Sequence, residues 1–126
     1  MGIWGIIMLV VCFMSFIMIG FGLWFSLACP KKINLVLGYR TPMSMKNHET
    51  WEYGNLVAGK LMWRTGCVLL VGSLIALFSL MSSSDTVIRT VGIIIIIVHA
   101  VMIFGTIIIS EIKLHKRFDR QGNLKG

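Results

Sequence analysis

Residues 90–110 read TVGIIIIIVHAVMIFGTIIIS and contain no Asp, Glu, Lys or Arg. Residues 1–30 and 65–84 also lack these residue types, so the three uncharged runs are 30, 20 and 21 residues long in chain order. A helix needs about 20 apolar residues to cross the hydrocarbon core of a bilayer. The runs do not alternate between polar and apolar residues, as the strands of a membrane barrel do. They therefore predict three membrane-spanning α-helices.

The composition agrees with a membrane protein. Of the 126 residues, 56% are hydrophobic and only 13% are charged, whereas a soluble domain carries about 25% charged residues. We predict one all-α integral membrane domain, residues 1–126, with spans at about 3–29, 62–82 and 88–112. The start of the first run holds no Lys or Arg, and the run is longer than the apolar core of a secretory signal, so we expect a retained helix.

The twelve Lys and Arg residues predict the orientation of the chain. Six lie between the first two uncharged runs, five lie after the third run, and only Arg89 lies between the last two runs. Segments next to membrane helices are enriched in Lys and Arg on the cytoplasmic side. We therefore expect the N-terminus outside, and the loop of about residues 30–64 and the tail of residues 113–126 in the cytoplasm.

The same orientation gives the positive charge a role. A formal net charge of +7 can indicate nucleic-acid binding, but here the basic residues face the anionic inner leaflet of the membrane. Membrane lipid is thus a predicted partner and nucleic acid is not. Cys29 and Cys67 lie near the cytoplasmic interface, where thiols stay reduced, and together with Cys12 they form no CxxC pair.

Pairs of small residues spaced four apart indicate where membrane helices approach one another. The first span contains Gly22 and Ser26, and the second contains Gly72 and Ala76. The third span contains Thr106 and Ser110. We expect these positions to face neighbouring helices.

His99 lies well inside the third uncharged run. Ionisable side chains within a membrane are costly, so they commonly mark functional sites. The structural alternative is a neutral imidazole that is hydrogen-bonded to a neighbouring helix, and both interpretations stay open. The three uncharged runs contain no membrane carboxylate, which disfavours proton-coupled drug export.

The predicted cytoplasmic loop is chemically dense. Pro42 and the polar residues after it predict a turn, and either Ser44 or Asn47 can cap a new helix, with Glu49 in its first turn. No proline follows before the second span. A helix that begins near residue 47 is therefore expected to run directly into the membrane.

On that helix Trp51, Asn55 and Gly59 share one face, because they are spaced four residues apart. We expect this face to pack against the turn at residues 38–41. Arg40 is then a candidate to pair with Glu49 or Glu52, because unpaired charges near lipid are poorly solvated. The loop is either a folded cap that stabilises the bundle or a binding surface.

Several separated residues of this region resemble the SdpI-type immunity protein family. The matching positions are Gly38, Tyr39, Arg40, Thr41, Pro42, Ser44, Asn47, Glu49, Trp51, Asn55, Gly59, Lys60 and Gly66. Family members carry a G-[YI]-R-T signature after an Asn, then an N-x-E-x-W segment, then an N…G-K run that enters a helix. The resemblance covers residues 34–66 and fits the three-helix layout, whereas the longer family form has additional N-terminal helices.

The resemblance implies a non-enzymatic protein in the bacterial plasma membrane that protects the cell against a secreted, membrane-acting toxic peptide. Signalling through a cytoplasmic regulator and homo-oligomerisation belong to the same expectation, and no cofactor or metal does. The binding residues that it implies are Asn34, Gly38, Tyr39, Arg40, Thr41, Asn47, Glu49, Trp51, Asn55, Gly59 and Lys60.

Two other classes of function remain as alternatives. His48, Glu49 and Glu52 resemble an incomplete H-E-x-x-H zinc motif, but catalytic zinc needs three protein ligands and His115 is distant in sequence, so we do not expect an enzyme. The second alternative is an accessory subunit of a larger membrane complex, in which Lys116, Arg117 and Arg120 of the tail bind a partner or the leaflet.

Overall fold

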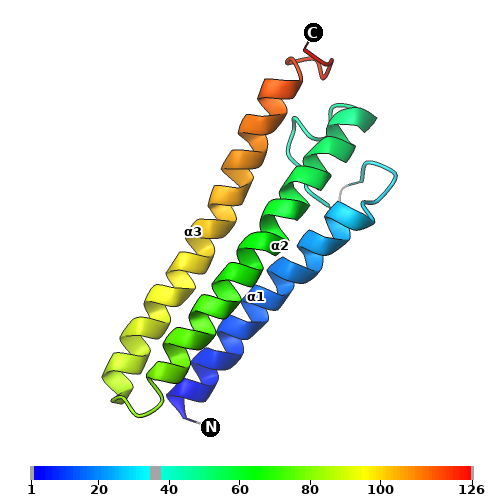
Figure 1. Ribbon diagram of the computed structural model, residues 1–126. Coiled ribbons are helices and arrows are strands. Elements are labelled where there is room, and N and C mark those ends of the chain that lie inside the picture. Colours follow the sequence, from blue (N-terminus) through cyan, green and yellow to red (C-terminus); the bar gives the residue numbers. More distant parts are fainter. Residues whose placement is uncertain (1, 35–37, 126) are drawn as a thin grey trace.

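A computed structural model describes residues 2–34 and 38–125. Its helices are α1 (Ile3–Leu27), α2 (His48–Ser79) and α3 (Asp85–Arg117). Each is long and apolar enough to cross a membrane, so the prediction of three membrane-spanning helices is confirmed. Figure 1 shows an up-down-up bundle in which the N-terminus lies beside the α2–α3 connection. The C-terminus and the α1–α2 loop lie at the opposite end, called here the loop end.

The helices differ in length, and this difference shapes the loop end. The 32 residues of α2 and the 33 of α3 correspond to roughly 50 Å of helix each. The 25 residues of α1 correspond to only about 38 Å. At the loop end α2 and α3 therefore extend past α1 (Figure 1), and the α1–α2 loop occupies the space beside them.

The closest helix packing joins α1 and α2 through glycines. A Cβ atom on Gly59 would lie 2.6 Å from both the Gly22 oxygen and the Ser26 nitrogen, and one on Gly66 would lie 2.9 Å from Ile19. Gly22 and Ser26 thus face a neighbouring helix as predicted. A Cβ on Gly72 would meet nothing within 4 Å, so the prediction that Gly72 packs against a helix is wrong.

Helix α3 packs less closely, through an apolar cluster near the N-terminus and a polar contact near mid-bundle. The cluster consists of Ile7, Val11, Leu77 and Ile88. Most other large apolar side chains point outward, and Val68 is 71% exposed. Such exposure suits a protein whose solvent along the spans is lipid.

Candidate binding site at the loop end of the bundle

The loop end carries a folded unit that we call the cap, residues 38–55 together with 107–124. Its first part is a turn that Thr41 and Ser44 close by exchanging hydrogen bonds. The Thr41 N–H donates to Ser44 Oγ over 2.9 Å, and the Ser44 N–H donates to Thr41 Oγ1 over 3.2 Å. Ser44 Oγ in turn donates to the Tyr39 carbonyl over 2.9 Å. These bonds give residues 39–44 a fixed shape without regular secondary structure.

Asn47 begins α2 and ties it to the chain beyond α3. The Thr50 N–H donates to Asn47 Oδ1 over 2.9 Å, and the Asn47 N–H donates to Thr50 Oγ1 over 3.0 Å. This reciprocal pair is a capping box. Of the two capping residues that the sequence allowed, the structure selects Asn47, whose Nδ2 also donates to the Gly122 carbonyl over 2.7 Å.

Trp51 and Asn55 lie fully buried where the turn meets α2. Asn55 Oδ1 accepts from the Tyr39 N–H over 2.7 Å, and Asn55 Nδ2 donates to the Trp51 carbonyl over 2.9 Å. Gly38 has a φ of 102°, and a Cβ there would lie 2.7 Å from Asn55 Oδ1. The Trp51 indole donates to the Pro30 carbonyl over 2.7 Å. Position 38 needs glycine for two reasons: its φ is positive, and a Cβ there would collide with Asn55.

The structure thus brings together the turn and most of the helix face that the sequence placed opposite it. Gly59 is the exception, because it packs against α1 rather than against the turn. On this face of α2, Trp51 and Asn55 contact the α1–α2 loop, whereas Gly59 packs against α1.

Tyr39 extends the cap to α3. Its hydroxyl donates to Glu111 Oε1 over 2.5 Å, and Glu111 Oε2 lies 3.5 Å from His115 Nε2. Burial of the ring raises the pKa of Tyr39 well above its ordinary value, and the Glu111 carboxylate raises it further. Because the hydroxyl keeps its proton, it stays a donor, and it links the loop to α3 across the cap.

The last turn of α3 supplies the apolar part of the cap. Leu114 and Phe118 are buried together with Met43 of the turn. The Tyr53 ring packs edge-on against Phe118, with centroids 5.8 Å apart, and the Arg117 guanidinium lies 4.7 Å from the Tyr53 centroid. This cluster was not predicted from the sequence. The available signal was the spacing of Leu114 and Phe118 by four residues within a charged segment.

The remaining predicted binding residues lie at the surface or at the edge of the cap. Arg40, Glu49 and Lys60 are exposed, and Asn34 is half-buried. Glu52 Oε1 lies 3.1 Å from His48 Nε2, whereas pairing of Arg40 with Glu49 or Glu52 stays a prediction. The cap therefore consists of a buried hydrogen-bonded frame and an exposed charged surface.

The two histidines of the alternative zinc motif lie on different helices and face different carboxylates. His48 faces Glu52 within α2, and His115 faces Glu111 within α3. Over residues 2–34 and 38–125, no three His, Cys, Asp or Glu side chains are placed to hold a metal together.

His99 makes a polar contact between spans. Its ring is fully buried, with Nδ1 2.9 Å from the Ile95 carbonyl and Nε2 2.8 Å from Ser15 Oγ. A carbonyl oxygen can only accept, so Nδ1 carries a proton and Nε2 accepts from the hydroxyl in the neutral ring. His99 thus joins α3 to α1, at a distance along the bundle from the cap.

Comparison with known proteins assigns the chain to a family. The model of the SdpI/YfhL protein family matches residues 31–110, which contain the turn, all of α2 and most of α3. No curated protein and no solved structure matches the chain. Because the match covers more than half of the 126 residues, this multi-pass membrane protein belongs to the SdpI/YfhL family.

Proposed function

We propose that this protein protects a bacterial cell against a secreted toxic peptide that acts on the membrane. Membership in the SdpI/YfhL family makes it an immunity-type membrane protein in the broad sense. We further propose that the cap binds rather than catalyses, and that its exposed surface, with Arg40 and Glu49, is the working site. The observation that carries the proposal is the hydrogen bonding of the Tyr39 backbone to Asn55, which joins two separated parts of the family's sequence pattern.

The construction of the cap supports binding. Connections between bundle helices are commonly only 2–8 residues long, whereas residues 28–47 separate α1 from α2. Asn47 and Tyr39 tie this longer segment to the C-terminal segment and to α3. A surface held in this way loses little conformational entropy when it binds a partner.

The distribution of Lys and Arg, eleven in residues 31–64 and 113–125 against Arg89 alone before the third span, supports a cytoplasmic cap. A cap on that side is accessible to a cytoplasmic regulator. It is accessible to a toxic peptide only after that peptide has entered the bilayer. Regulator binding is therefore the step that we assign to the cap, with homo-oligomerisation as a further part of the proposal.

Arg40→Ala tests the working site, with Lys46→Ala as its matched control. Both side chains are exposed cations of the cap, so the two variants lose the same charge. We expect Arg40→Ala to lower the toxin dose that a sensitive host survives by about tenfold, the effect of losing one strong contact. Lys46→Ala should protect like the wild type. Membrane levels of each variant are measured by immunoblotting.

Wild-type protection by both Arg40→Ala and Glu49→Ala would contradict a binding role for this surface. Loss of Arg40→Ala protein from the membrane would instead assign the residue to the stability of the bundle. Trp51→Ala is less informative, because Trp51 is fully buried and truncating a buried Trp costs about 3–5 kcal/mol of stability.

A further inference from the structure

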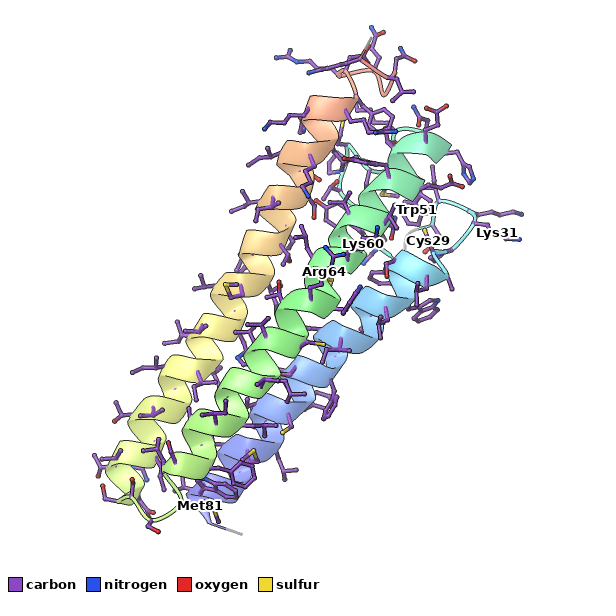
Figure 2. All side chains as sticks on the ribbon, viewed as in Figure 1. Cys29, Lys31, Trp51, Lys60, Arg64 and Met81 are labelled. Atoms are coloured by element: carbon purple, nitrogen blue, oxygen red, sulfur yellow. The ribbon has the colours of Figure 1, made fainter. Side chains whose placement is uncertain are left out.

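Two cations interrupt the outward face of α2. Lys60 and Arg64 are four residues apart and therefore lie on one face of the helix, and both are exposed. The same face continues with Val68 and then Ile75, which are 71% and 67% exposed. Figure 2 shows Lys60 and Arg64 on α2 between Trp51 and Met81, nearer to Trp51. The cations thus lie at the loop-side end of a surface that is otherwise built for lipid.

The neighbouring helix α1 indicates the depth of these two cations along the bundle. A Cβ on Gly22 of α1 would contact the Trp63 nitrogen, so Trp63 and Arg64 are level with Gly22. Helix α1 continues five residues further, to Leu27, which is about 7.5 Å. Arg64 is therefore level with a part of α1 that is still apolar, and its long side chain can reach toward the headgroups.

The protein supplies little negative charge there. The chain has five acidic residues, of which Glu52 lies 3.1 Å from His48 and Glu111 lies 3.5 Å from His115. The Arg64 guanidinium instead lies 5.7 Å from the centre of the Trp63 ring. Two cations at the edge of the low-dielectric hydrocarbon core attract an anion strongly. The membrane itself supplies such anions in its lipid headgroups.

We propose that Lys60 and Arg64 bind the phosphate of an anionic phospholipid in the leaflet at the loop end. Arg64 offers a planar fork of donors for phosphate oxygens, and Lys60 adds a compact positive charge one turn away. Trp63 lies at the depth where indole rings pack beside headgroups. The site is separate from the cap surface around Arg40, and the proposal does not depend on immunity.

The test compares lipid retention by the purified full-length protein. Detergent-solubilised protein is incubated with equal amounts of phosphatidylglycerol and phosphatidylcholine, and native mass spectrometry counts the lipids that stay bound. We expect the wild type to prefer phosphatidylglycerol. The double variant K60Q/R64Q should lose this preference by about 25-fold, since each cation near the headgroups contributes about fivefold. K31Q/K32Q removes the same charge from exposed loop positions and should keep it.

Four results would overturn the proposal. The first is a wild type without preference, and the second is an equal loss in K60Q/R64Q and K31Q/K32Q, which would indicate general surface charge. The third is displacement of the lipid by inorganic phosphate, which would assign the site to a soluble anion. K60R/R64K keeps both charges and should retain the lipid. Loss of binding in this variant despite normal helicity would also contradict the site.

Discussion

The Asn55 side chain holds the turn of the cap against α2. Its side-chain oxygen accepts from the Tyr39 backbone, and its side-chain nitrogen donates to the Trp51 carbonyl. A buried donor without an acceptor costs about 1–3 kcal/mol of stability. Replacing Asn55 by a residue without a side-chain acceptor would leave the Tyr39 N–H without its partner and destabilise the cap by this amount. The close approach also requires Gly38, whose hydrogen faces Asn55 where a methyl group would not fit. The contact between the turn and α2 therefore requires both Gly38 and Asn55.

Tyr39 makes the stability of the cap depend on pH. Burial and then Glu111 raise its pKa in the folded protein, above the ordinary value of about 10 for an unfolded tyrosine. The unfolded state therefore loses its proton first as pH rises. The stabilisation from Tyr39 is complete below about pH 10 and is lost above it, as pH rises toward the folded pKa.

Tyr39→Phe should abolish this dependence and lower the free energy of unfolding near neutral pH by about 1.5–3 kcal/mol, the value of a hydrogen bond to a charged group. Thermal unfolding in micelles, followed by tryptophan fluorescence at a series of pH values, measures both effects. Tyr53→Phe is the matched control, because Tyr53 packs on Phe118 through its ring. An alkaline loss of stability that is the same in the wild type and Tyr39→Phe would refute the role of Tyr39.

At the scale of helices, the sequence predicts that each helix forms. It predicts less well which side of a helix packs against a neighbouring helix. Uncharged length predicts a membrane helix because lipid excludes charge, and a capping residue such as Asn47 marks a start through local hydrogen bonds. Spacing alone does not say which side of a helix meets a neighbour. Gly72 and Gly59 therefore read alike in the sequence, although only Gly59 contacts another helix. The burial of Phe118 was missed for the same reason, since it depends on a distant loop.

Gly59 and Gly72 provide a matched test of the helix packing. Gly59→Ala would place a methyl group 2.6 Å from backbone atoms of α1, and such overpacking costs about 1–3 kcal/mol. Gly72→Ala meets no neighbour and should stabilise α2 by up to about 1 kcal/mol through helix propensity. Unfolding in mixed micelles of increasing denaturing detergent measures both variants. Equal effects of the two substitutions would contradict the α1–α2 contact through Gly59.

At the scale of the whole molecule, the two ends of the bundle differ in both structure and charge. The loop end carries the cap, and eleven of the twelve Lys and Arg residues lie in residues 31–64 and 113–125, whereas the other end has a short connection followed by Arg89. The structural asymmetry could not be predicted fully, because the hydrogen bonds of the cap join residues up to 75 positions apart. The charge asymmetry is visible in the sequence and predicts the orientation.

That orientation is testable with reporters at the two ends of the bundle. A fluorescent protein fused after the C-terminal residue should fluoresce, because it folds in the cytoplasm, and alkaline phosphatase at the same position should be inactive. Fusions made after Ser83, in the α2–α3 connection, should give the opposite pair of results. The physical reason is the bias of Lys and Arg toward the cytoplasmic side, where eleven cations outweigh Arg89. Active phosphatase at the C-terminus, with fluorescence after Ser83, would place the cap outside the cell and exclude binding of a cytoplasmic regulator there.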